Sequence, residues 1–170
     1  MTKAYLLGAL HDGTVRKLTY RIAQKDQEFI KFILKGIKKL GQNAWMYQEG
    51  KTRQLFIVEF SKSFLTNFRI VSVRDKIDYI RGYFDTEGGV SRHPNVRYYL
   101  YFAQKNQADL EHVKGLIEEL GILCGIIHNP SKSVDPNYWR FFIRAQSYEK
   151  FAKIIGSWHP VKSQFLRMKI

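Results

Sequence analysis

Residues 79–89, YIRGYFDTEGG, form an apolar, helix-like segment that ends in acids and glycines. A shorter segment of the same kind, YLLGALHDG, occupies residues 5–13. We expect helices over about residues 3–11 and 76–86, which places Asp12 and Glu87 at their last turns. The helix macrodipole is negative there, so an exposed carboxylate costs up to about 1 kcal/mol. Because a carboxylate stands at this unfavourable position in both segments, we infer that the two acids have a function.

The two segments belong to an internal repeat. Residues 23–27, AQKDQ, recur as AQKNQ at 103–107, and KKLG at 38–41 recurs as EELG at 118–121. FIV at 56–58 resembles FFI at 141–143. The matches keep their order while their offset drifts from 75 to 85, as loop insertions would cause. We therefore predict two repeats, residues 1–72 and 73–170.

Each repeat has the pattern of an αββαββα unit. After the first helix, strand-like alternation covers residues 14–24 and 89–104. Amphipathic helices follow at 27–40 and 107–120, closed by Gly41 and Gly121. Hairpins are expected at 44–60 and in 122–144, and short helices at 62–67 and 146–156. The predicted fold class is α+β, with the repeats packed about a pseudo-twofold axis through the acid-bearing helices, where Gly8, Ala9 and Gly82 permit close approach.

The charge and composition of the chain indicate which kind of partner it binds and in which cellular compartment it works. The chain has 170 residues, 45% of them hydrophobic, and a net charge of +13 that both repeats share. Such a charge favours nucleic acid over a membrane surface. The single cysteine, Cys124, excludes a disulfide within the chain and fits a reducing compartment. Lacking a recognisable signal peptide or a transmembrane-length apolar run, the protein is expected to be soluble and intracellular, in a prokaryotic cytoplasm or an organelle, and not secreted.

The paired acids predict a metal site. If the two helices pack side by side, Asp12 and Glu87 approach each other, and a divalent cation would relieve their repulsion. Mg²⁺ prefers oxygen ligands and commonly combines one or two carboxylates with substrate phosphates. Asp-Gly and Glu-Gly are also ordinary helix-stop pairs, but their recurrence favours catalysis. The histidines show no zinc-ligand spacing; they are His11, His93, His112, His128 and His159.

Tyr79–Gly89 resembles the LAGLIDADG motif, with glycine, acid, acid and glycine in the usual spacing, and residues 5–13 resemble its first copy. The first copy departs from the pattern: Gly8 lies five residues before Gly13, not six, and Leu10 stands where the second copy has Asp85. The resemblance implies a single-chain homing endonuclease in which Asp12 and Glu87 bind catalytic Mg²⁺.

The resemblance also implies supporting residues. Gln24 and Gln104 match the position of a glutamine that orders water around the scissile phosphate. Lys162 is our candidate for a basic residue that supports the transition state, and Lys76 is a weaker one. An exposed helix-start glutamine or a solvated surface lysine is the alternative for each.

A basic sheet face is expected to contact the DNA. Alternation points Leu18, Tyr20 and Ile22 inward and Thr19 and Arg21 outward. In the second repeat, residues 98, 100 and 102 point inward and residues 97, 99 and 101 outward. A saddle of two antiparallel sheets suits the major groove. The candidate DNA-binding residues are Arg16, Lys17, Thr19, Arg21, Tyr47, Lys51, Arg53, Arg92, Arg97, Tyr99, Tyr101, Lys132, Trp139 and Arg140.

The predicted function is site-specific cleavage of double-stranded DNA. An intron-encoded, monomeric hydrolase would break both strands of a long target site by metal-dependent phosphodiester hydrolysis. Two alternatives stay open: a maturase of the same fold that binds intron RNA, and a DNA-binding regulator that has lost catalysis. Cleavage that requires Mg²⁺ and both acids would separate the first from the others.

Overall fold

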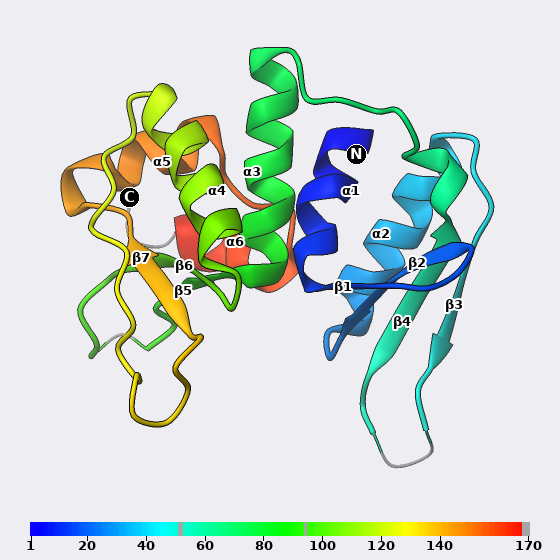
Figure 1. The fold of residues 1–170 in the computed structure, drawn as a ribbon, viewed down its shortest axis with the longest axis horizontal. Helices are drawn as coiled ribbons and strands as arrows, with labels where there is room; N and C mark the ends of the chain where they lie inside the picture. Colours follow the sequence, from blue (N-terminus) through cyan, green and yellow to red (C-terminus); the bar gives the residue numbers. More distant parts are fainter. Residues whose placement is uncertain (51–52, 94, 168–170) are drawn as a thin grey trace. The chain divides into compact units, whose positions relative to one another are not determined.

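The computed structural model describes residues 1–50, 53–93 and 95–167 (Figure 1). It divides into two compact units, residues 1–86 and 87–170. Both units combine helices with an antiparallel sheet, so the predicted α+β class is confirmed. Among the described residues, no helix is long and apolar enough to cross a membrane.

Unit 1 contains a four-stranded sheet with strand order β1-β2-β4-β3. The chain runs through α1 (Lys3–Ala9), the 3-10 turn η1 (Leu10–Asp12), β1 (Gly13–Val15), β2 (Thr19–Gln24), α2 (Gln27–Lys39), β3 (Ala44–Gln48), β4 (Phe56–Ser61), the 3-10 turn η2 (Lys62–Phe64) and α3 (Val73–Glu87). The helix expected at 62–67 is therefore only a short turn. Leu18 was expected in the core but is 72% exposed, because β2 begins one residue later.

The sheet of unit 1 is covered by α2. Asp26 caps this helix by accepting a hydrogen bond from the Phe29 amide at 3.0 Å, which satisfies one of the free donors of the first turn. Ile33 on α2 and the strand residues Ile22 and Val58 are fully buried. Register pairs Ile22 with Val58 on one face, so alternation directs Arg21 and its partner Glu59 to the other face.

Glycines let α1 and α3 pack backbone to backbone, side by side in Figure 1. A Cβ atom on Gly8 would lie under 3.0 Å from the backbone of Tyr79, and one on Gly82 would lie as close to the backbone of Tyr5. The contact is reciprocal, since each glycine meets the residue three positions before the other glycine. Gly8 and Gly82 are thus equivalent positions of the two helices.

The 3-10 turn η1 makes up for the residue that the first motif lacks. A 3-10 step rises about 2.0 Å, against about 1.5 Å in an α-helix. The four steps from Gly8 to Asp12, three of them in η1, therefore advance about 7.5 Å along the axis. The five α-helical steps from Gly82 to Glu87 advance about the same distance. Each acid lies equally far beyond its contact glycine.

Unit 2 contains a three-stranded sheet with strand order β5-β6-β7. Its elements are β5 (Gly88–Val90), β6 (Leu100–Gln104), α4 (Gln107–Glu119), β7 (Trp139–Phe142), the 3-10 turn η3 (Ala145–Ser147), α5 (Tyr148–Ile154) and α6 (Pro160–Arg167). The strand-like run at 122–127 pairs only through isolated bridges, Cys124 with Ile143 and His128 with Arg140. Helix α6 was not predicted and extends the expected αββαββα order.

The boundary between the compact units differs from the boundary between the repeats. Helix α3 opens the second repeat in sequence, yet residues 73–86 cluster with unit 1. The physical reason is the close packing of α3 on α1. The repeat boundary at residues 72/73 stays a prediction about the sequence.

Candidate catalytic carboxylates and basic sheet faces

In unit 1, Asp12 is exposed at the end of η1 and accepts a hydrogen bond from Nε2 of Gln24. Strand register explains why Asp12 and Gln24 lie within hydrogen-bond distance of each other. Gly13 pairs with Ile22, so Asp12 lies beside Ala23 and within reach of the next residue, Gln24. The structure thus brings together the predicted acid and glutamine of this repeat.

Unit 2 repeats this arrangement with Glu87. Nε2 of Gln104 donates to Oε1 of Glu87 at 2.9 Å, and the Lys105 amide donates to Oε1 of Gln104 at 2.7 Å, which fixes the amide orientation. Gly88 pairs with Phe102, the same relation as in unit 1. The loop between the strands is longer here, residues 91–99 instead of 16–18. Register, not loop length, therefore produces the acid–glutamine pair.

Lys162 supports the chain next to Glu87. Its side chain is buried, at 6% exposure, and its Nζ donates to the carbonyl oxygen of Gly88 at 2.6 Å. The weaker candidate, Lys76, lies eleven residues before Glu87 on α3, about 16 Å along the helix axis. Of the two lysines, only Lys162 lies at the acid-bearing end.

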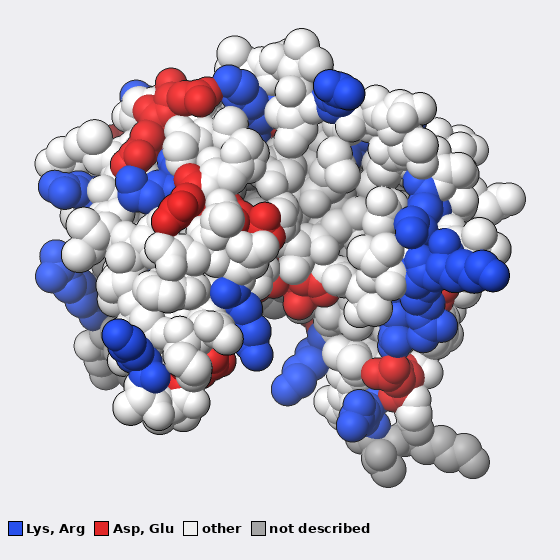
Figure 2. All heavy atoms as spheres, in the orientation of Figure 1, with Lys and Arg blue, Asp and Glu red and all other residues white. Residues whose placement is uncertain are grey.

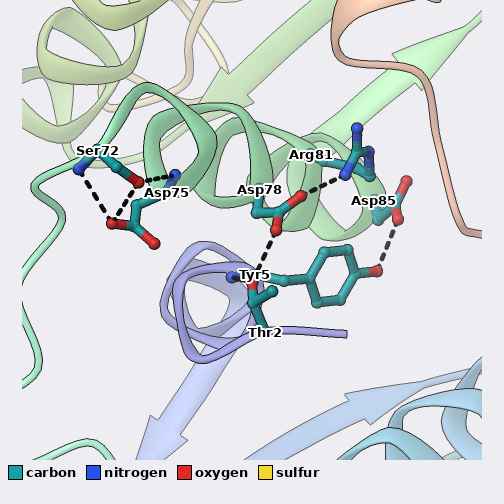
Figure 3. A network of polar contacts seen from close by, with 7 residues as sticks. All are labelled: Thr2, Tyr5, Ser72, Asp75, Asp78, Arg81 and Asp85. Carbon is teal, nitrogen blue, oxygen red and sulfur yellow. Dashed lines mark hydrogen bonds and ion pairs between the residues drawn. The ribbon is translucent and has the colours of Figure 1, made fainter.

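The first acid of the second motif is structural. Tyr5 donates to Oδ2 of Asp85 at 2.6 Å, and both residues are fully buried between α1 and α3 (Figure 3). Burial, together with the nearby Asp85 charge, raises the pKa of Tyr5 well above its usual value, so it remains a donor. His11 likewise turns to α3, with its Nε2 2.6 Å from the Tyr79 hydroxyl oxygen. Neither Asp85 nor His11 is presented to solvent as Asp12 is.

A further polar contact joins the two helices and is also drawn in Figure 3. Thr2 donates to Oδ2 of Asp78 at 3.0 Å, and Arg81 forms an ion pair with the other oxygen of that carboxylate. Ser72 and Asp75 cap the start of α3, where the Ser72 amide donates to Oδ2 of Asp75 at 3.0 Å. The Thr2–Asp78 hydrogen bond therefore joins the start of α1 to α3 at the end away from the motif acids.

No complete metal cage exists among residues 1–50, 53–93 and 95–167, where no three His, Cys, Asp or Glu side chains cluster. Each motif instead offers one carboxylate whose partner is an amide. Such a donor set does not suit a structural zinc ion, which takes four protein ligands. It fits Mg²⁺, which keeps several waters and completes its shell with substrate phosphates.

On the outward face of the unit 1 sheet, three predicted DNA-binding residues meet two acids that the sequence analysis missed. Thr19 donates to Oε1 of Glu59 at 2.5 Å and Tyr47 donates to Oε2 at 2.9 Å. Arg21 forms an ion pair with Glu49, and its guanidinium lies 5.9 Å from the Tyr47 ring centre. The available signal was an acid at an outward position of an otherwise apolar strand, residues 56–60.

The charges of this cluster are stabilised locally. Burial alone would raise the pKa of Glu59, but the hydrogen bonds from Thr19 and Tyr47 and the charges of Arg16 and Arg21 outweigh it and lower that pKa. The hydrogen bond to Glu49 raises the pKa of Arg21. Glu59 and Arg21 are therefore both ionised at neutral pH.

The outward face of the unit 2 sheet is aromatic. The Arg140 guanidinium lies 5.7 Å from the ring centre of Tyr101 and 5.1 Å from that of Phe142, and Tyr99 packs against both rings. Burial raises the pKa of Tyr101. Trp139 is not part of this face, because alternation along β7 places it on the side of buried Phe141.

The other predicted DNA-binding residues lie at the surface. Figure 2 shows Lys and Arg side chains gathered over the part of unit 1 where β1 turns into β2, and Lys62 donates there to the Arg16 carbonyl at 3.3 Å. Lys51 lies outside the described residues. The exposed candidates are Arg16, Lys17, Arg53, Arg92, Arg97 and Lys132.

Comparison with known proteins matches residues 75–156 to the family model of the LAGLIDADG-like domain. Variants of the homing endonuclease I-DmoI have a similar structure, with a TM-score of 0.69, 24% identity, and 95% and 94% of the two chains covered. The structure of I-DmoI in complex with DNA and Mn has a TM-score of 0.64 and 23% sequence identity, with 91% of this chain and 95% of that chain covered. The N-terminal LAGLIDADG domain of DUF199/WhiA has a TM-score of 0.70 and 17% sequence identity, with 91% of this chain and 80% of that chain covered. These likenesses show the fold. No curated protein sequence matches.

Proposed function

Because residues 75–156 match the family model of the LAGLIDADG-like domain and the fold resembles that of I-DmoI, we propose that the chain is a site-specific DNA endonuclease of the single-chain, two-repeat LAGLIDADG type. The observation that carries the proposal is the acid–glutamine pair, found in both units with the same strand register. The matched I-DmoI structures support it, because they contain that protein with DNA and Mn or Ca, or with its target DNA in the presence of Mg.

In this proposal Asp12 and Glu87 are ligands for divalent cations, with Mg²⁺ as the natural one. When bound, such a cation stabilises charge on the phosphodiester and favours ionisation of water. Gln24 and Gln104 orient the two carboxylates through their amide donors. Lys162 holds the peptide that follows Glu87, and its positive charge stabilises negative charge that develops nearby.

Sequence preference would come from the outward sheet faces. Thr19, Arg21 and Tyr47 in unit 1, and Tyr101 and Arg140 in unit 2, combine base-reading and stacking groups, while exposed lysines and arginines neutralise phosphates. The repeats carry different side chains here, so an imperfect palindrome is the expected target. We further propose that the protein acts as a monomer, is intron-encoded, and works in a reducing intracellular compartment.

The experiment is cleavage selection from a randomised duplex library, followed by cleavage of the recovered site with Mg²⁺ or Ca²⁺. Double-strand breaks should require Mg²⁺ and be lost in Asp12→Asn and Glu87→Gln. Glu28→Gln, which removes an equal charge from an exposed position on α2, should cleave like the parent. Duplex binding without cleavage would indicate a regulator, and Mg²⁺-independent binding to intron RNA alone would indicate a maturase. Either result rejects the endonuclease.

A further inference from the structure

The buried carboxylate of Glu59 sits beneath the proposed reading face of unit 1. Glu59 is 7% exposed, lies on the outward side of β4, and faces Arg21 directly across the β2–β4 ladder. Removing a charge from water is costly unless hydrogen bonds and opposite charges compensate it. A carboxylate retained here, between two apolar neighbours of the strand, therefore needs a specific reason.

Both oxygens of this carboxylate are occupied by hydroxyl groups. Oε1 accepts from Thr19 at 2.5 Å and Oε2 accepts from Tyr47 at 2.9 Å. An ionised carboxylate can only accept hydrogen bonds, and the pKa of Glu59 is lowered. Burial, with the bond to Glu59, raises the pKa of Tyr47 and keeps its proton in place. The direction of both hydrogen bonds is therefore fixed.

A fixed direction determines what the hydroxyls can do toward DNA. Each hydroxyl has one donor hydrogen and two acceptor lone pairs. With the hydrogen committed to Glu59, Thr19 and Tyr47 can only accept from a ligand. In the major groove, the base-edge donors are the amino groups of adenine and cytosine, whereas guanine N7 and O6 and thymine O4 are acceptors.

Arg21 supplies the opposite chemistry beside them. Its guanidinium is a pure donor, and its Nε atom is buried without a hydrogen-bond partner. Glu49 holds one end of the guanidinium and so fixes its plane. The face thus has a donor next to two acceptors whose polarity is already set.

Building on the endonuclease proposed above, we propose that Glu59 is a positioning residue for base recognition: by accepting the hydroxyl hydrogens of Thr19 and Tyr47, it makes their oxygens readers of adenine or cytosine amino groups in the major groove.

The test compares base-preference profiles, measured as duplex binding from a randomised library in Ca²⁺. Glu59→Gln keeps the shape but supplies an amide donor, which frees at least one hydroxyl to donate. At positions where the parent prefers adenine or cytosine, that preference should fall about tenfold or more, with a shift toward guanine or thymine. Thr19→Val and Tyr47→Phe, which each delete one hydroxyl, should weaken preference at a subset of the same positions.

The control is again Glu28→Gln, which makes the same change of net charge away from the sheet. It should alter affinity uniformly and leave the profile intact. If Glu59→Gln leaves the profile unchanged, or lowers affinity equally at every position, its role is only structural and the inference is wrong. If that variant does not fold, as judged by its thermal transition, the two hydroxyl deletions decide: unaltered profiles in both overturn it.

Failure of this inference is distinguishable from failure of the proposed function. A parent protein that selects no duplex at all contradicts both. A parent that selects and cleaves a site, whose adenine and cytosine preferences survive loss of both hydroxyls, contradicts only the role of Glu59.

Discussion

Cys124 shows how strongly unit 2 shields a single reactive group. Burial, followed by the charge of Glu118, raises the pKa of this thiol to about 12. We expect it to resist a thiol-specific reagent at pH 8 in the native protein and to react fully in denaturant, since the thiolate is the nucleophile. The chain has one cysteine, so absorbance of the released label reports it directly. Rapid labelling of native protein would contradict the burial of Cys124.

The same shift makes stability depend on pH. The folded protein holds the thiol proton more tightly than the unfolded chain, whose cysteine has a pKa of about 8.5. The stabilising contribution is therefore complete below that value and is lost as pH rises toward 12. Urea unfolding at pH 7 and pH 10 should show a smaller loss of stability in Cys124→Ala than in the parent. An equal loss would mean that the thiol is not linked to folding.

At the residue scale, the family resemblance and the repeat single out Asp12 with Gln24, and Glu87 with Gln104. Each acid accepts a hydrogen bond from its glutamine, and the catalytic roles of the four residues stay predictions. The Glu59 cluster was missed because its members come from three strands. Their meeting depends on cross-strand register, which a single sequence does not specify.

Among the helices, two glycines should respond in opposite ways to alanine. Gly82→Ala forces a methyl group into the backbone of α1, so we expect a loss of about 1–3 kcal/mol or more in the free energy of unfolding. Gly115 lies within α4, exposed, with open space around its Cβ position. Gly115→Ala should gain about 0.5–1 kcal/mol through lower backbone entropy. Denaturant unfolding measures both, and a tolerated Gly82→Ala would refute the close helix contact.

Element prediction was most accurate where composition alone decides the boundary. Helices α2 and α4 end within one residue of the predicted limits, and Gly41 and Gly121 have the expected positive φ values, 79° and 69°. It failed where tertiary packing decides. The change from α-helix to 3-10 turn at Leu10 sets how far Asp12 lies beyond the Gly8 contact, and the fourth strand of unit 2 is reduced to isolated bridges.

For the whole molecule, the net charge of +13 predicts a steep dependence of DNA affinity on salt. Each neutralised phosphate releases counterions, and six to ten such contacts lower affinity about a thousandfold or more between 50 and 200 mM salt. Titration of a fluorescent duplex over that range measures the slope. A flat response would contradict phosphate binding by the exposed cations.

The packing of α3 on α1 determines how the protein would behave if its chain were divided between the two repeats. Because α3 starts the second repeat but completes the core of unit 1, a gene severed after codon 72 would encode two incomplete polypeptides. The larger polypeptide would expose to solvent the face of α3 that packs on α1, including Tyr83 and Asp85, which are buried in the intact protein. It should therefore self-associate when purified alone. Produced together, the two polypeptides should co-purify as a one-to-one pair, held by the seam that the reciprocal glycines create.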